Sequence, residues 1–186
     1  MSIVLQSTSG GSVTINEPST ASNFTQTLPA ATGTVMVSGN MPTFSAYIGT
    51  STTTTATSGV WTKVAYDTKE WDTNTNYSTT NYRFTPTVAG YYLISAAIST
   101  SGGNASGDRQ NALAIYKNGV SYRNGANSPI NTQLDVAQIA SLVYFNGSTD
   151  YVEIYWWQLL TASQTATGVG GPSYFQNFNG ALIRAA

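Results

Sequence analysis

The sequence contains no cysteine and no histidine among its 186 residues. Without cysteine, the chain has no disulfide, no thiolate nucleophile and no sulfur metal site. Without histidine, it lacks the commonest general base and transition-metal ligand, and a serine-histidine-acid triad is excluded. Charge is also scarce, because only 8% of the residues are charged, whereas a typical domain carries about 25%.

The few charges also restrict the partners of the chain. The net charge is −1 and no basic run occurs, so we expect no nucleic-acid partner. No segment approaches the roughly 18 apolar residues that cross a bilayer, so we expect no membrane insertion. Residues 1–6 have no basic flank and only a short apolar run, which does not resemble a signal peptide.

The pattern of the chain predicts an all-β fold. Alanine is scattered, Glu and Lys are rare, and the apolar runs are short and separated by Gly, Asn, Ser and Pro. Asn-Gly pairs at 118–119 and 146–147 predict tight turns, and residues 50–59, 99–107 and 161–172 are expected to be loops. We expect strands at 12–15, 34–37, 44–48, 63–66, 83–85, 91–99, 110–117, 120–123, 132–143, 151–159 and 178–184.

One of these strands, Tyr151 to Gln158, is bulky at almost every position. Such a strand is expected to be covered on both faces. Two explanations remain open: the second cover is another subunit, or the strand lies centrally in the core with a few exposed aromatics.

The composition changes between residues 38 and 42. Residues 1–40 contain no Lys, Arg, Trp or Tyr, and Glu17 is their only acid. A segment of this kind buries little by itself, so it should pack on something else. We therefore expect an attachment arm at 1–40 and a globular head at 41–186.

The spacing of aromatic residues between Tyr66 and Ala96 is specific. It resembles the signature of the globular head of complement component 1q, a relative of tumour necrosis factor, although Tyr66 and Ile94 replace Phe and Ala96 replaces an aromatic residue. The resemblance continues in the flanks, Pro42 to Tyr47 and Phe178 to Leu182. The matching positions that we take as the fold signature are Tyr66, Asp72, Tyr77, Phe84, Gly90 and Tyr92.

The resemblance implies a jelly-roll sandwich of about ten strands that forms a tight homotrimer. Some relatives bind calcium near the trimer axis, so the resemblance also allows a structural calcium ion in this protein. No calcium ligand can be matched residue by residue, so the metal assignment is unknown. We expect no other cofactor.

The arm carries a second resemblance. Residues 24–35 are similar to segments common in structural proteins of tailed bacteriophages, where they typically precede a fibre or knob domain. The residues that carry this resemblance are Phe24, Leu28, Pro29 and Val35.

Chemistry is restricted to a few acids. Asp67, Glu70 and Asp72 lie close in sequence, and two functions can be considered, a carboxylate pair or a cation site. A solvated turn with local ion pairs to Lys63 and Lys69 is favoured over both. We therefore expect no catalytic residues.

Aromatic residues beside loops are candidates for stacking on sugar rings, because sugars have an apolar face and hydroxylated edges. Burial in the core or in a trimer interface is the favoured alternative for each one taken singly. The candidates are Trp61, Trp71, Tyr122 and Tyr174.

Together these features predict a non-enzymatic bacteriophage virion protein, a homotrimeric fibre or knob that docks through residues 1–40. Its partners would be itself, other capsid or tail proteins, and a host-surface glycan or protein. It would be made in the host cytoplasm and lie on the exterior of the head or tail. The alternatives are a capsid decoration protein that mainly stabilises the shell, a bacterial carbohydrate-binding or adhesion module, and a polysaccharide depolymerase using Asp67 or Glu70.

Overall fold

The structure is a computed structural model that describes residues 2–16, 19–20, 22–23, 25, 27, 30, 35–49, 52–101, 110–126, 128–129, 134–159, 163–168 and 175–186. Within these ranges the regular structure is β, apart from one turn of 3-10 helix, η1 (Ser38–Asn40). The same ranges contain no helix of the length and apolarity that a membrane crossing requires. The chain divides into two compact units, Met1–Gly33 and Thr34–Ala186, and each is described by itself.

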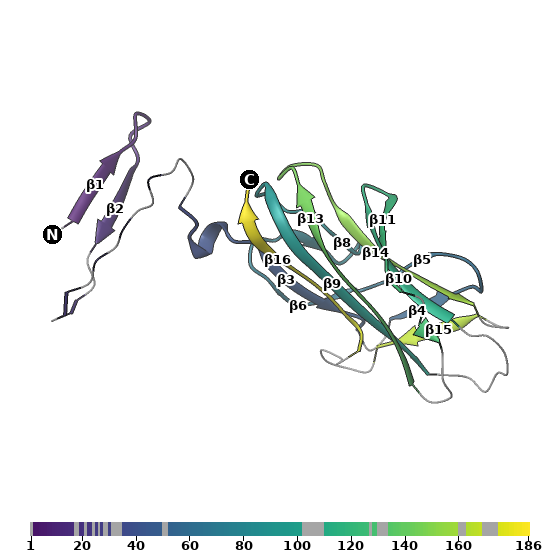
Figure 1. Cartoon of the computed structure of the whole chain (residues 1–186). Coiled ribbons are helices and arrows are strands. Elements are labelled where there is room, and N and C mark those ends of the chain that lie inside the picture. The colour runs from purple at the N-terminus through teal and green to yellow at the C-terminus, as the bar shows by residue number, and fades with distance from the viewer. Residues whose placement is uncertain are drawn as a thin grey trace. The chain divides into compact units, whose positions relative to one another are not determined.

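The second unit is a sandwich of two antiparallel layers (Figure 1). One layer is a five-stranded sheet in which the longest strands lie side by side. Its strands, in order across the sheet, are β13 (Leu134–Phe145), β9 (Gly90–Ser101), β16 (Asn177–Ala185), β3 (Thr43–Tyr47) and β6 (Thr68–Asp72).

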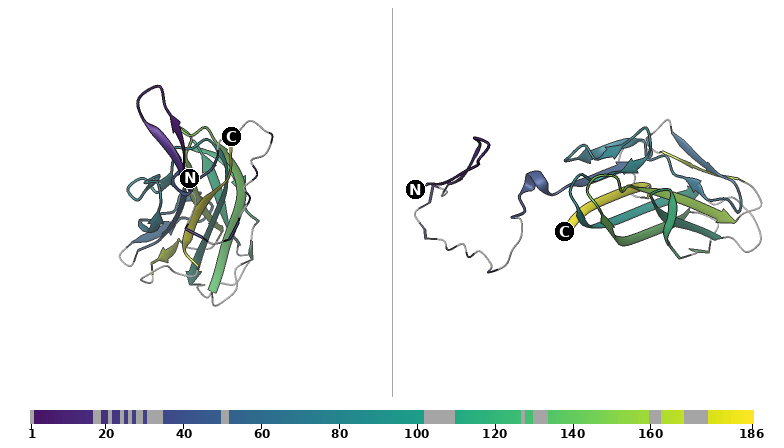
Figure 2. Two further views of the ribbon diagram at one scale, coloured as in Figure 1. Left: turned by 90° about the vertical axis from the view of Figure 1, so that its left-hand side faces the viewer. Right: turned by 90° about the horizontal axis from the view of Figure 1, so that it is seen from above.

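The other layer is a seven-stranded sheet, and the view from above in Figure 2 shows it stacked against the first. The jelly-roll sandwich expected from the sequence is therefore confirmed. Its main path runs through β11 (Val120–Asn124), β10 (Gln110–Lys117), β14 (Val152–Leu159), β8 (Arg83–Phe84) and β7 (Tyr77–Ser78), with β12 (Ser128–Pro129) beside β10 and β5 (Thr62–Lys63) beside β14. Because several strands are two-residue ladders, the described part of this unit has fourteen strands rather than about ten.

The signature residues meet in the core between the two layers. Phe84 is completely buried and stacks on Phe44 with the ring centroids 4.3 Å apart. Tyr66, Tyr77 and Tyr92 are buried as well, and each hydroxyl donates a 2.7 Å hydrogen bond to a backbone carbonyl. Burial raises the pKa of Tyr92 to about 12, so its hydroxyl stays protonated as this donor.

Two further signature residues act on the backbone. The Asp72 carboxylate accepts hydrogen bonds of 3.0 Å from the backbone N–H groups of Asn76 and Tyr77, which fixes the turn between β6 and β7. A Cβ at Gly90 would meet the backbone carbonyl of Arg184 on the neighbouring strand β16. Gly90 is therefore required for close packing of β9 on β16.

The two Asn-Gly pairs form different turns. Asn118 and Gly119 both have positive φ, 53° and 80°, which makes the tight hairpin between β10 and β11 as expected. The prediction of a second such hairpin at Asn146 and Gly147 is wrong, because β13 ends at Phe145 and β14 begins only at Val152. Asn146 instead accepts hydrogen bonds at Oδ1 from the N–H groups of residues 148–150 and closes a longer loop.

Several strand boundaries also differ from those expected. Residues 35–37, the described part of the strand expected at 34–37, pair with no other strand, and Met36 packs against the core instead. Two expected loops contain strands that pair with each other, β4 (Thr53–Ala56) and β15 (Gln164–Thr167). The acidic segment expected to be a turn forms the edge strand β6.

In the described residues of the first unit, β1 (Ser2–Gln6) and β2 (Ser12–Asn16) pair as a hairpin. The register places Ile3 opposite Ile15 and Leu5 opposite Val13, so that one face carries four aliphatic side chains. Each of these is more than half exposed within the chain. A lone two-stranded hairpin is marginally stable in water, so this face is suited to being covered by something outside its own unit.

Candidate binding surfaces

The outward face of the five-stranded sheet is uncharged over a wide area. Residues 91–97 of β9, 138–144 of β13 and 177–181 of β16 contain no charged residue. Leu93 lies opposite Leu142 and Tyr91 opposite Tyr144, and all four side chains are between 41% and 57% exposed. This exposed apolar patch is therefore a candidate interaction site. We call this region the sheet face.

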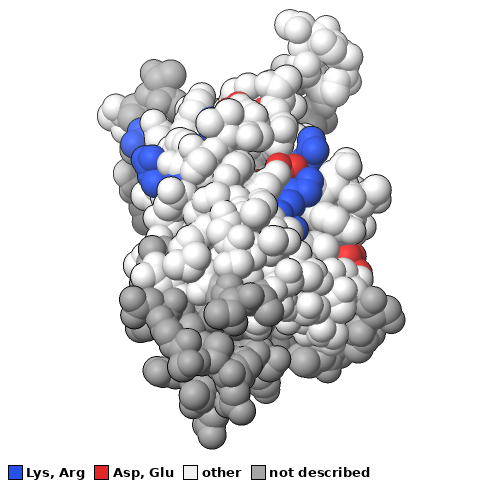
Figure 3. All heavy atoms as spheres, turned by 90° about the vertical axis from the view of Figure 1, so that its right-hand side faces the viewer, with Lys and Arg blue, Asp and Glu red and all other residues white. Residues whose placement is uncertain are grey.

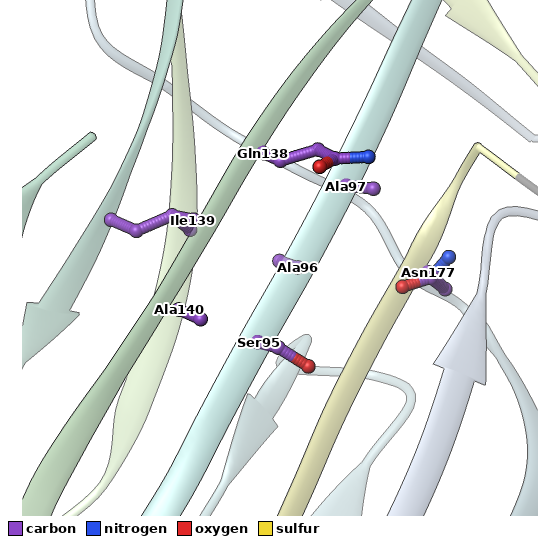
Figure 4. A pocket seen from close by; sticks show the side chains of 7 residues that line it. All are labelled: Ser95, Ala96, Ala97, Gln138, Ile139, Ala140 and Asn177. Carbon is purple, nitrogen blue, oxygen red and sulfur yellow. The ribbon is translucent and has the colours of Figure 1, made fainter. Parts of the chain in front are cut away.

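A shallow hollow lies on the sheet face beside the apolar pairs. It has a volume of about 340 Å³, and small side chains form its floor. Figure 4 shows Gln138 reaching across β9 toward Ala97, whereas Ile139 points to the other side of the sheet. The hollow is lined by Ser95, Ala96, Ala97, Gln138, Ile139, Ala140 and Asn177.

Four aromatic side chains form a second surface, on the outward face of the seven-stranded sheet. Tyr116 stacks on Tyr155 with centroids 3.9 Å apart, and Trp61 lies 6.4 Å from Tyr116 and 6.3 Å from Trp157. All four are partly exposed. We call this group the aromatic platform.

The aromatic platform also explains the bulky strand β14. Ala112 and Ala114 lie opposite Trp157 and Tyr155 on the same face and are buried, so the rings cover them. This cover comes from the chain itself. Within the single chain, β14 is therefore a central strand with partly exposed aromatics, which agrees with the second of the two explanations.

A charged group borders the aromatic platform. Glu153 is 3% exposed and forms ion pairs with Lys63 at 3.1 Å and Arg83 at 3.3 Å. Arg83 also lies 4.2 Å from the centre of the Tyr151 ring. Burial, followed by the charge of Glu153, raises the pKa of the Tyr155 hydroxyl, which stays a neutral hydrogen-bonding group. The border therefore offers two cations around one carboxylate.

The candidates for sugar contact lie in different places. Trp61 belongs to the aromatic platform, but Trp71 lies on the edge strand β6 of the other sheet, 47% exposed. Tyr122 packs partly buried against the core, and Tyr174 lies outside the described residues. The structure therefore places the three described candidates apart and not in one site. Tyr116, Tyr155 and Trp157 were missed, although the alternation of bulky residues along 153–157 indicates an outward row.

The three neighbouring acids are each engaged by a different part of the structure. Asp67 accepts hydrogen bonds from Thr52 and from the backbone N–H of Gly49, and Glu70 accepts one from Ser45. Asp72 holds the turn described above. In the part of the chain that the structure describes, no group of three or more acidic side chains is placed to hold a metal ion.

Asp67 provides a test of this structural role. Burial tends to raise the pKa of its carboxyl, but hydrogen bonds from Thr52, the Gly49 N–H and Thr68 outweigh burial and hold the pKa below its ordinary value. Its contribution to stability is therefore present above about pH 4 and is lost as the pH falls through the lowered value. We expect Asp67→Asn to cost roughly 1–2 kcal/mol at pH 7 in urea unfolding, and less at pH 3. An equal cost at both pH values would contradict this role.

The residues of the arm resemblance give little structural information. Phe24, Leu28 and Pro29 lie outside the described residues, and Val35 is 70% exposed. The described parts of 1–40 carry the aliphatic face of the hairpin and no charged residue.

Charge is sparse on the face drawn in Figure 3, where the few charged atoms gather in small groups between broad uncharged areas. The low charge of the sequence is therefore also visible on this part of the molecule. Surfaces of this kind repel one another weakly, which suits lasting association.

Comparison with known proteins identifies the fold. No family model matches the chain, and no curated protein matches it. Among solved structures, the globular domain of zebrafish complement 1qA is 18% identical over 78% of this chain and 99% of its own, with a TM-score of 0.53.

Two further structures are similar. The tumour necrosis factor Eiger from S. frugiperda is 10% identical over 79% of this chain and 95% of its own, with a TM-score of 0.56. Murine APRIL is 8% identical over 77% of this chain and 99% of its own, with a TM-score of 0.51. These likenesses confirm that the fold is the jelly roll of complement 1q and tumour necrosis factor domains.

Proposed function

We propose that the protein is a non-enzymatic structural component of a tailed bacteriophage, a homotrimer that presents three jelly-roll heads on the exterior of the virion. The observation that carries the proposal is the sheet face, which is uncharged and exposes Tyr91, Leu93, Leu142 and Tyr144. The complement 1q resemblance, which implies a tight trimer, and the likeness of the fold support this face as the contact between copies. Closed cyclic assembly would cover it in every copy.

The arm would attach the trimer to the particle. Its phage-like segment supports a virion location, and the aliphatic face of the hairpin supplies an apolar surface for docking on a capsid or tail protein. No reaction is assigned to the head, because Asp67, Glu70 and Asp72 are committed to hydrogen bonds within the fold.

The aromatic platform is the proposed contact for a host-surface glycan. Its rings provide apolar faces, while the tyrosine hydroxyls and the Lys63–Glu153–Arg83 group provide polar partners at the border. It lies on the opposite layer of the sandwich from the sheet face, so trimer formation would leave it accessible.

Glycan binding can be tested with an array of neutral and acidic oligosaccharides. We expect Trp61→Ala and Trp157→Ala each to weaken binding at least about tenfold, because central aromatic residues dominate binding energy. Phe175→Ala, which removes a ring that is 39% exposed and not part of the platform, is the matched control and should bind normally. If the native protein binds a glycan and both tryptophan variants bind it equally well, the platform is not the contact.

A second function, capsid decoration that mainly stabilises the shell, is favoured by the apolar hairpin. Locating the protein in an intact particle would decide whether it lies on the head or on the tail. Deleting residues 42–186 would abolish adsorption if the head binds the host, and would leave adsorption intact but capsids fragile if it decorates the shell. A bacterial carbohydrate-binding or adhesion module would not be found in a particle at all.

A further inference from the structure

Trp71 and the hollow lie in the same row across the five-stranded sheet. Trp71 on β6 is paired with Ser45 on β3, which is paired with Asn179 on β16. Asn179 is paired with Ser95 on β9, and Ser95 with Ala140 on β13. The large side chain therefore lies at one edge of the sheet and the hollow near the other edge, at the same level along the strands.

Both features are on the outward side of this sheet. Phe44 directly precedes Ser45 on β3 and is buried in the core. Because successive residues of a strand point to opposite faces, Ser45 and its partner Trp71 face away from the core. Trp71 is 47% exposed on an edge strand. The floor of the hollow is made from the small side chains Ser95, Ala97 and Ala140.

The two features also fit chemically. An indole ring needs an apolar floor and an acceptor for its N–H group, and the hollow has alanines at its floor and the amide side chain of Gln138 at its rim. Two of the charges beside Trp71 are paired with each other, because Lys69 lies 3.3 Å from Asp72, and the neighbouring Glu70 accepts a hydrogen bond from Ser45. The charged groups of this edge are therefore already engaged within their own chain when the edge approaches an uncharged face.

We propose that Trp71 of each copy inserts into the hollow of the next copy, which closes the ring of three. This inference rests on the proposed trimer and names the contact that forms it. Rotation about an axis along the strands keeps every residue at its own level, so a residue at one edge meets features of its own row on the neighbouring copy. A head-to-tail contact of this kind forms a closed ring of three when each copy is rotated by a third of a turn from the last.

The test is a double-mutant cycle on the full chain. Trp71→Ala removes the inserted ring, and Ala140→Trp fills the hollow. We expect each to raise the concentration at which half of the protein is trimeric at least tenfold, measured by sedimentation equilibrium. If Trp71 occupies this hollow, the double variant assembles no more weakly than either single variant. Once the Trp71 ring has been removed, the side chain introduced at position 140 displaces nothing from the hollow.

The outcomes separate this inference from the proposed function. Trp61→Ala, on the other layer, is the matched control and should leave assembly unchanged. A native trimer that Trp71→Ala does not weaken, or costs that add fully in the double variant, would overturn the contact but leave the trimer standing. A native protein that is monomeric would overturn both. Far-ultraviolet circular dichroism verifies that each variant has the native fold.

Discussion

Placing aspartate at both Leu93 and Leu142 is expected to convert the proposed trimer into a monomer. The two leucines form a cross-strand pair on the sheet face and are 43% and 57% exposed. In an assembly that covers this face, both carboxylates would be taken out of water without a cationic partner. Burying an unpaired charge costs several kcal/mol, and three-fold symmetry repeats that cost at every interface.

The expected weakening is on the order of a thousandfold or more in the dissociation constant. Val120→Asp is the matched control, because Val120 is 70% exposed on β11 in the other layer. It should leave assembly unchanged. Both variants should keep the thermal unfolding and circular dichroism of a folded head, since the substituted side chains point into solvent in the single chain. A Leu93→Asp/Leu142→Asp variant that remains fully trimeric would show that copies associate through another surface.

Replacing Phe84 with alanine is expected to cost about 3–5 kcal/mol of unfolding free energy. Phe84 is completely buried and stacks on Phe44, and its ring also lies 5.6 Å from Tyr92 and 5.9 Å from Phe145. Truncation would leave a cavity bordered by three rings, which cannot close without moving strands of both layers.

Urea unfolding at one fixed protein concentration measures this cost, since stability that is coupled to assembly depends on concentration. Val120→Ala is the control, because that side chain is 70% exposed and little apolar surface is lost from a packed core. A loss below about 1 kcal/mol for Phe84→Ala would mean that the signature residues are not the centre of the core.

Much of the fold could be predicted because its determinants are local. Residues 110–117 form β10 as expected, since a short continuous apolar run at 112–116 and a following Asn-Gly pair define both the strand and its turn. The aromatic signature residues could be assigned to the core because the resemblance to the complement component 1q head implies core packing at these positions. Tyr66, Tyr77, Phe84 and Tyr92 are all buried.

The strands that were missed depend on partners far away in sequence. Residues 53–56 are rich in threonine and have no apolar alternation, yet they pair with residues 164–167, where the hydroxyls of Thr55 and Thr165 lie 3.1 Å apart. Neither segment by itself indicates a strand. The strand expected at 34–37 fails for the opposite reason, since favourable residues at 35–37 find no strand to pair with.

The binding surfaces were only partly predictable for the same reason. Trp61 could be proposed from its exposed position beside loops, but the platform also needs the register of β10 against β14, which sets Tyr116 against Tyr155. The proposed contact of Trp71 depends on pairings across five strands. Tyr91, Tyr144 and Trp71 belong to the proposed contacts between copies, while most of the other described aromatic residues pack in the core or the aromatic platform.

The central claim is that copies of this chain associate through the sheet face, and the mass of the native protein in solution tests it most directly. Sedimentation equilibrium at micromolar concentration should give three times the chain mass of 19.7 kDa. A mass equal to that of a single chain across the micromolar range would contradict the account.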